Sequence, residues 1–173
     1  MPRLKNAVFI KEGQICQDPW IYLDNSSPVP PACRAIVSFD RWNRERESLL
    51  SNTDATGVCL ETHHNFNDVY ESLQAIGVIA IHINKFSDGR YFTLARLLRE
   101  RLEFRGELRA CGDVLADQLF YMKRCGFDAF ELKPGKSVEA GLAALQTFSQ
   151  TYQAAVDEKR PLFVRRERGV RIE

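Results

Sequence analysis

Residues 86–132, FSDGRYFTLARLLRERLEFRGELRACGDVLADQLFYMKRCGFDAFEL, decide the fold class. They read as a loop, a helix, a strand, a helix and a strand, which is the repeating unit of a parallel α/β sheet. We expect helices at 91–103 and 113–126, and strands at 106–110 and 127–132. Polar and charged residues stand where each strand passes into a helix. In parallel sheets ligands usually bind at that edge, because strand ends and helix N-termini converge there.

The same alternation begins upstream, at Ala35. Apolar runs predict strands at 35–39, 56–62 and 78–83, and the last is rich in β-branched residues, which is typical of a strand covered on both faces. Further helices are expected at 42–50, 65–77 and 137–152; Ser137 caps the last, and the second places these residues on one face: Phe66, Val69, Leu73 and Ile76. The pattern predicts an α/β fold with a mainly parallel sheet and right-handed crossovers. An open three-layer sandwich and a partial barrel both fit.

The two ends of the chain differ from this core. Residues 1–34 predict an N-terminal β-hairpin appendage, with strands at 7–10 and 20–23, followed by a proline-rich linker. The βα core spans 35–156. The basic tail, 157–173, has room for an edge strand at 161–166. We expect all of this to form a single domain.

Composition narrows the classes of function. The chain has 173 residues, 45% of them apolar, and a net charge of +1, so no overall field attracts nucleic acid or membranes. Five widely spaced cysteines argue against a disulfide framework and favour free thiols in a reducing compartment. The N-terminus has no signal-peptide pattern, and no segment is long enough to span a bilayer. We therefore expect a cytoplasmic protein with no nucleic-acid and no membrane partner.

The loop after the strand at 78–83 is the first candidate site. It leads into a helix, whose free N–H groups attract anions. Arg90 and Lys85 are suited to clamping an oxyanion, Gly89 allows a close backbone approach, and Asp88 can orient the cations or act as a base. In the plainer interpretation, Ser87 or Asp88 only caps the helix and Gly89 makes the turn.

The second candidate site is the end of the next strand, at residues 109–113, which is also expected to lead into a helix. Cys111 is predicted near arginines and a helix N-terminus, where the pKa of a thiol falls. Without a general base in the sequence nearby, we interpret Cys111 as a small buried apolar residue and Asp113 as a helix N-cap. The neighbouring arginines predict a salt-bridged helix face, because two pairs have i,i+4 spacing: Arg96–Glu100 and Arg99–Glu103.

Metal and cofactor signals are weak. Alternation places Cys59, Glu61 and His63 on one face of a strand, near His64 and His82, but no HExxH or CxxC pattern supports a metal site, and we expect none. The sequence has no GxGxxG, GxxxxGK[ST] or GxSxG motif and no cysteine cluster for an iron–sulfur centre. It therefore identifies no cofactor and leaves open whether the protein is an enzyme.

The blocks DGRYFTLARLLRERLEFRGELRACGD and RCGFDAF resemble a bacterial family of unknown function. The resemblance is close over residues 78–132 and looser upstream, through FDRW and GVCLE. That family recurs beside sulfite reductase genes and carries the label of an oxidoreductase of sulfite reduction. The family block implies these site residues: Asp88, Gly89, Arg90, Arg96, Arg99, Arg109, Gly112, Asp113, Asp117 and Gln118. The sequence departs from the family block in two places. Tyr91-Phe92-Thr93 stands where Gly-(Phe/Tyr)-Ser is commoner, and Cys111 stands where a small aliphatic residue is commoner, which argues against a catalytic Cys111.

The resemblance implies two functions. In the first, the protein is a non-catalytic accessory of assimilatory sulfate or sulfite reduction that binds sulfite reductase or another enzyme of sulfate assimilation. This function predicts an exposed apolar or arginine-rich face near the helix carrying Arg96 and Arg99. In the second, it is a small α/β enzyme or carrier that binds a sulfur oxyanion or phosphosulfate nucleotide at the strand-end edge, through Asp88, Arg90 and Arg109. A general α/β scaffold with no role in sulfur metabolism is a third interpretation.

Overall fold

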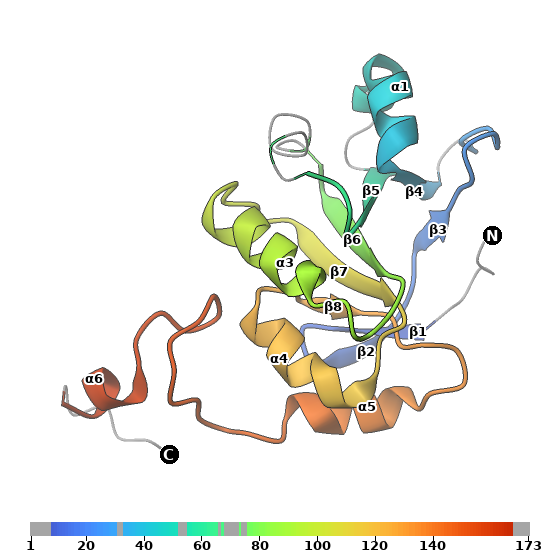
Figure 1. Ribbon diagram of the computed structural model, residues 1–173. Coiled ribbons are helices and arrows are strands. Elements are labelled where there is room, and N and C mark those ends of the chain that lie inside the picture. The colour runs from blue at the N-terminus through green and yellow to red at the C-terminus, as the bar shows by residue number, and fades with distance from the viewer. Residues whose placement is uncertain are drawn as a thin grey trace.

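The protein forms one eight-stranded sheet with helices packed against it (Figure 1). The computed structural model describes residues 8–30, 33–51, 55–65, 67, 73 and 76–167. The strand order is β2-β1-β8-β7-β6-β5-β4-β3. The strands from β3 to β8 are parallel, whereas β1 is antiparallel to β8 and β2 is antiparallel to β1. The fold is thus α/β with a mainly parallel sheet, as the sequence predicted.

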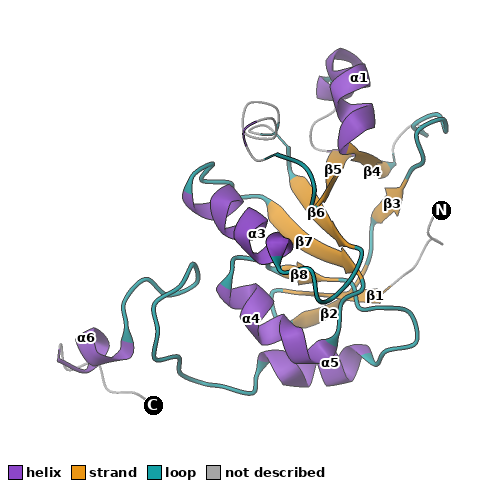
Figure 2. Ribbon diagram, in the orientation of Figure 1, coloured by secondary structure: helices purple, strands orange, loops and turns teal. Residues whose placement is uncertain are grey.

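The element bounds follow the hydrophobic pattern. The strands are β1 (Val8–Lys11), β2 (Gln14–Gln17), β3 (Trp20–Tyr22), β4 (Arg34–Ser38), β5 (Thr56–Glu61), β6 (Val78–Ile83), β7 (Glu107–Gly112) and β8 (Ala129–Phe130). The helices are α1 (Phe39–Leu50), α3 (Arg90–Glu100), the 3₁₀ turn η2 (Ala116–Gln118), α4 (Leu119–Arg124), α5 (Val138–Leu145) and α6 (Leu162–Glu167), shown in Figure 2. Most of the helix predicted at 65–77 lies outside the described residues.

Consecutive strands from β3 to β8 are also neighbours in the sheet. Right-handed crossovers that always step in the same direction place their helices on one face. Accordingly, α3, α4 and α5 gather on one side of the sheet in Figure 1. The larger apolar cluster fills that side and includes Trp42, Ile81, Tyr91 and Leu98. A smaller cluster, including Trp20, Ile36 and Cys111, covers the opposite face.

The sheet curls into a half-barrel. Tyr22 on β3 donates a hydrogen bond to Glu131, which follows β8, five strands further along the sheet. Five steps across a flat sheet span about 24 Å, because neighbouring strands lie about 4.8 Å apart. No tyrosine–glutamate contact reaches that far. The two strands must therefore face each other across the concave side, which favours the partial barrel over the open sandwich.

The N-terminal prediction is only partly confirmed. A hairpin exists, but it joins β1 to β2 through a turn at Glu12 and Gly13, both at positive φ. The expected pairing of 7–10 with 20–23 is wrong, because β3 pairs with β4 at the far edge of the sheet. The segment 8–22 is therefore part of the main sheet, with one strand pair at one edge and β3 at the other, and is not an appendage.

The end of the chain also differs from expectation. The segment 161–166 was predicted as an edge strand, but α6 occupies 162–167. Pro161 explains the helix, because its carbonyl accepts hydrogen bonds from the N–H groups of Val164 and Arg165. The preceding residues, 146–161, form an extended arm that carries α6 away from the sheet (Figure 1). Arg124 anchors this arm through Thr151, Gln153 and Asp157.

Candidate functional site

A cavity of about 280 Å³ opens at the carboxyl ends of the parallel strands. Residues on the concave face of five strands, β3 to β7, line it: Tyr22, Ile36, Ser38, Cys59, Glu61, His82 and Cys111. Loop residues that follow these strands complete the wall, and they include Asp24, His63 and His64. We call this space the mouth cavity. It lies at the edge where the sequence predicts a ligand site.

The thiol of Cys111 lies at the inner wall of the mouth cavity, with only 2% of the residue exposed. Its Sγ lies 3.6 Å from the carbonyl oxygen of Ile81 and 3.9 Å from Nδ1 of His82. Hydrogen bonds from Cys59 and His82 hold the pKa of the Cys111 thiol well below its usual range, against the effect of burial. Cys111 lies in a strand and not at a helix N-terminus, so the lowered pKa comes from neighbouring side chains.

The histidines of the mouth cavity interact with each other and with Glu61. The rings of His63 and His64 have centroids 4.3 Å apart, and Nδ1 of His64 accepts a hydrogen bond from the Glu61 N–H. Burial and the neighbouring His63 lower the pKa of His64. Within the described ranges, no group of three or more His, Cys, Asp or Glu side chains is arranged to hold a metal ion.

The DGR loop forms a closed ion pair beside the cavity. Arg90 donates from Nε to Oδ1 of Asp88 over 2.9 Å and from Nη2 to Oδ2 over 2.8 Å. Thr62, at the end of β5, donates to the same carboxylate. These contacts lower the pKa of Asp88. Lys85, Ser87 and Gly89 are exposed in the turn, so the loop presents a neutralised pair to the solvent.

The next strand end holds a second polar cluster. The Asp113 carboxylate accepts hydrogen bonds from Lys133 Nζ over 2.8 Å and from the Phe86 N–H over 3.1 Å. The prediction that Asp113 caps a helix is wrong, because the first helical turn starts only at Ala116. Gln118 donates to the Phe86 carbonyl, and Asp117 is exposed. Gly112 has φ of +96° and comes so close to Ile83 that a Cβ would lie 2.4 Å from its carbonyl oxygen.

Arg109 lies on the concave face and has no exposed surface. Its guanidinium contacts three carboxylates, with oxygens of Asp18 and Glu107 at 2.6 Å and one of Glu131 at 3.0 Å. The ring of Phe9 lies 4.3 Å from the guanidinium carbon. Three carboxylates already exceed the charge of Arg109, so this arginine is committed to the interior and does not face an external oxyanion.

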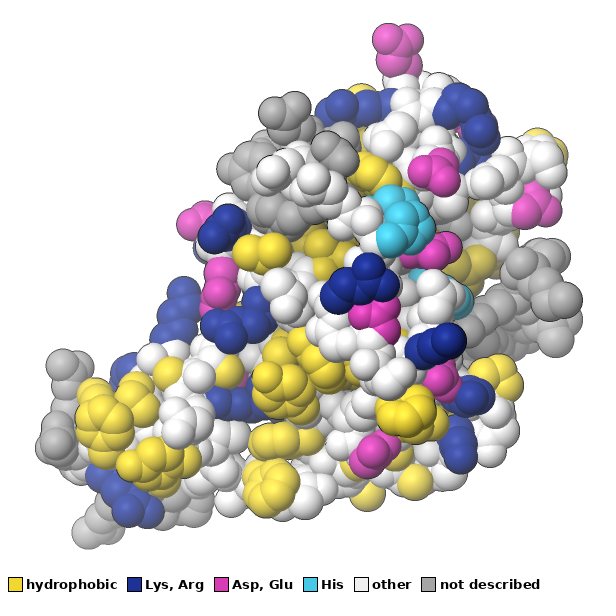
Figure 3. All heavy atoms as spheres, in the orientation of Figure 1, with side chains coloured by type: hydrophobic (Ala, Val, Ile, Leu, Met, Phe, Trp, Pro, Cys, Tyr) yellow, Lys and Arg dark blue, Asp and Glu magenta, His cyan; other side chains and the backbone are white. Residues whose placement is uncertain are grey.

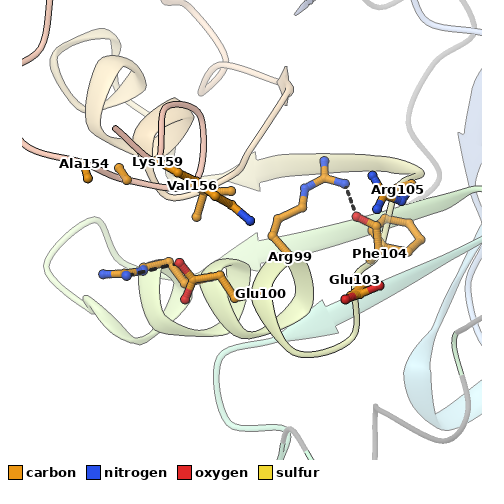
Figure 4. Close-up of a pocket in the computed structure, with 10 residues that line it drawn as sticks. Arg99, Glu100, Glu103, Phe104, Arg105, Ala154, Val156 and Lys159 are labelled. Carbon is orange, nitrogen blue, oxygen red and sulfur yellow. Dashed lines mark hydrogen bonds and ion pairs between the residues drawn. The ribbon is translucent and has the colours of Figure 1, made fainter. Parts of the chain in front are cut away.

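Arg96 and Arg99 lie at the opposite end of α3, beside a hollow of about 690 Å³. Figure 4 shows this hollow between α3, the loop at Glu103–Arg105 and the arm at Ala154–Lys159. Arg96 forms the predicted pair with Glu100, at 3.3 Å. The predicted Arg99–Glu103 pair is wrong, because Arg99 instead binds Asp128 and three backbone carbonyls. We call this space the arginine hollow.

Exposed aromatic side chains lie on α4, α6 and the arm, and the arm also lines the arginine hollow. Four aromatic side chains on α4, the arm and α6 are more than half exposed: Tyr121 at 58%, Phe148 at 61%, Tyr152 at 63% and Phe163 at 53%. Phe148 stacks on Phe120 of α4, with ring centroids 5.0 Å apart, which joins the arm to the body. Figure 3 shows apolar side chains over α3, α4 and the region of α6 on one side of the molecule. We call the four residues the aromatic face.

The structure brings together residues that the sequence did not associate. Asp18 and Tyr22 reach the concave face because β3 closes the half-barrel. Thr62 joins Asp88 and Arg90, since β5 and β6 are neighbours. The DGR loop and Asp113 meet at Phe86. Arg96 and Arg99 lie at the other end of α3, and Arg109 lies in the interior. The only sequence signal for Tyr22 is its alternation with Trp20 in a strand.

The fold and these sites define the class as an α/β half-barrel with a polar cavity at its strand ends. Residues 57–163 match the family described as "Bacterial protein of unknown function (DUF934)". This match covers more than half of the chain, and the protein belongs to that family, in agreement with the resemblance of its DGR and RCGFDAF blocks. Comparisons with curated proteins and with solved structures returned no match. Within the described part of the chain, no helix has the length and apolar character needed to cross a bilayer.

Proposed function

We propose that this protein is an accessory protein of assimilatory sulfate and sulfite reduction and that it acts by binding sulfite reductase. The observation that carries the proposal is the aromatic face, in which Tyr121, Phe148, Tyr152 and Phe163 expose more than half of their surface. Exposed apolar patches of this kind mark protein–protein contact sites. The link to sulfite reductase comes from the family that the chain resembles.

The chemistry of the face fits a protein partner. Interfaces are enriched in aromatic residues and arginine, and a few such residues carry most of the binding energy. Beside the aromatic rings, the arginine hollow exposes Arg96, Arg105 and Lys159. The accessory function predicts an exposed apolar or arginine-rich face near α3. Exposed aromatic side chains with basic residues beside them fit this prediction. We therefore place the contact surface on the arm, α4, α6 and the end of α3.

Co-elution of the purified protein with purified sulfite reductase from the same organism tests this function. We expect the wild type to shift into the reductase peak on size exclusion, and Phe148→Ala to reduce the shift. Leu50→Ala is the matched control, because Leu50 is an exposed apolar residue on α1, away from the aromatic face. Absence of co-elution for the wild type, together with unchanged reductase activity on its addition, would contradict the proposal.

A second candidate is a small enzyme or carrier that binds a sulfur oxyanion or a phosphosulfate nucleotide at the strand-end edge. The position of the mouth cavity beside the DGR loop favours it. The charges oppose it, because Arg90 is already paired with Asp88, and Asp24 and Glu61 line the cavity. A thermal-shift series with sulfite, sulfate and phosphosulfate nucleotides tests this candidate. A stabilisation that is lost in Arg90→Ala would establish it in place of the accessory function.

A further inference from the structure

The mouth cavity gathers nucleophilic groups that the proposed function does not use. Cys59 on β5, His82 on β6 and Cys111 on β7 all line it. These strands are neighbours, and their register places the three side chains on the same concave face. Two thiols and an imidazole therefore share one space of about 280 Å³, close to the roughly 300 Å³ at the small end of ligand sites.

The surroundings of Cys111 favour a thiolate. His82 presents Nδ1 at 3.9 Å from Sγ, within the range for a hydrogen bond to sulfur. The Cys59 thiol donates a second hydrogen bond. The Tyr22 hydroxyl, which donates to Glu131, also lies within hydrogen-bonding reach of the Cys111 sulfur and contributes to the lowered pKa of Cys111. Donors of this kind stabilise a thiolate, which is the nucleophilic form of cysteine.

The charged groups around the cavity select the reagent. The ionisable groups that face Cys111 from the packed elements, or line the cavity above it, are Tyr22, Asp24, Asp40, Cys59, Glu61, His63, His64 and His82. Arg109, two residues before Cys111 on β7, is neutralised by three carboxylates. Among the described residues, three carboxylates line the cavity and no lysine or arginine does, so the field of these residues disfavours anions and favours neutral or cationic molecules.

We propose that Cys111 is the nucleophile of a thiol-exchange site for small, uncharged or cationic disulfides. The Cys111 thiolate attacks one sulfur of the disulfide, a new S–S bond forms to Sγ, and the original S–S bond breaks. The other half leaves as a thiolate with the bonding electron pair and takes a proton from solvent. The Cys111 sulfur is oxidised and the leaving sulfur is reduced, so no further oxidant enters the reaction. This site is independent of the proposed function.

Three disulfides of similar size and different charge test the site on the intact protein: cystamine, 2-hydroxyethyl disulfide and dithiodiglycolate. Mass spectrometry of peptides gives the rate of modification at Cys111 separately from the other four thiols. We expect the cationic and neutral reagents to modify Cys111 at least tenfold faster than the anionic one, in about the ratio that local charge selection produces. Equal rates for all three reagents, or an unmodified Cys111, would overturn the proposal.

The pH dependence of the same rate tests the thiolate. A free thiol with a pKa of about 8.5 loses about tenfold in rate for each pH unit below that value. We expect Cys111 to lose less than threefold between about pH 8 and pH 6, and His82→Asn to restore a steep loss. His63→Asn is the matched control, because His63 lies at the exposed rim. If the wild-type rate falls with pH as steeply as that of a free thiol, the proposal is overturned, even if the His82 variant does not fold.

Discussion

At the scale of single residues, the interior of the half-barrel depends most on Arg109. Its guanidinium forms ion pairs with Asp18, Glu107 and Glu131. Glu107 also forms an ion pair with Nζ of Lys11, at 2.9 Å. Burial alone would lower the pKa of Arg109, but its neighbours, among them Glu107 and Asp18, raise that pKa by more, so the arginine stays charged. The network joins β7 to the segment before β3 and so helps to hold the curled sheet closed.

Replacing Arg109 by methionine is expected to lower the free energy of unfolding by about 3–5 kcal/mol, because carboxylates would be left buried without their partner. Arg96→Met is the control, since the exposed Arg96–Glu100 pair contributes about 0.5 kcal/mol or less. Urea unfolding at neutral pH measures both variants. A loss below about 1 kcal/mol for Arg109→Met would mean that the network does not hold the sheet together.

Asp24 gives a pH-dependent prediction. Hydrogen bonds from the backbone of Ser26 and from Ser27 lower its pKa to about 2. A carboxylate with a lowered folded-state pKa stabilises the fold above its unfolded pKa of about 3.9, and this contribution is lost as the pH falls to about 2. Asp24→Ala should therefore destabilise the protein at about pH 6, and the difference from the wild type should vanish near pH 2. Unfolding curves at a series of pH values measure this, and a difference that stays constant with pH would contradict it.

At the scale of secondary-structure elements, the sequence predicts the regular segments well. The strands β4 to β7 and the helices α1 and α3 follow hydrophobic periodicity, and Ser137 accepts the expected capping hydrogen bond from the Ala140 N–H. Gly126 has the positive φ expected after a helix. Two errors are local, because the strand expected at 161–166 is the helix α6 and the helix expected at 137–152 ends at Leu145. The others concern long-range pairing. Periodicity finds the strand at Trp20 but cannot show that β3 pairs with β4, and i,i+4 spacing cannot show that Arg99 prefers Asp128 to Glu103.

The glycine after α4 offers a test at this scale. Gly126 has φ of +108°, and a Cβ there would lie 2.6 Å from Cγ of Arg99. Gly135 has a similar φ of +83° but no atom within 4 Å of such a Cβ. Both alanine variants should carry backbone strain of about 1–2 kcal/mol. Gly126→Ala should cost about 1–3 kcal/mol more, because it overpacks the Arg99 side chain. Equal losses in thermal unfolding would show that the Arg99 contact is not restrictive.

At the scale of the whole molecule, the curled sheet separates two surfaces. The mouth cavity lies at the carboxyl ends of the strands, while the arginine hollow and the aromatic face lie at the other end of α3 and on the arm. The sequence predicted the strand-end edge as a site because the carboxyl ends of parallel strands converge. The sequence could not predict which residues form the aromatic face. The spacing of Phe148 and Tyr152 predicts an amphipathic helix that would bury them, whereas their exposure depends on the course of the arm.

The separation of these surfaces makes their functions separable by mutation. Cys111→Ala should abolish thiol exchange in the mouth cavity and leave binding to sulfite reductase unchanged, because it alters no residue of the aromatic face. Exchange kinetics and co-elution, measured on the same preparation, check this. Loss of reductase binding in a Cys111→Ala protein of normal stability would show that the cavity and the contact surface act together.

The affinity of the protein for purified sulfite reductase, measured by titration calorimetry, tests the central claim most directly. We expect the wild type to bind, and the truncation of one exposed aromatic anchor, Phe163→Ala, to weaken binding by about 2 kcal/mol, or about thirtyfold in Kd. Leu50→Ala should bind as the wild type does. Wild-type binding that is insensitive to Phe163 would contradict the proposed contact surface, and the absence of any binding would contradict the accessory function itself.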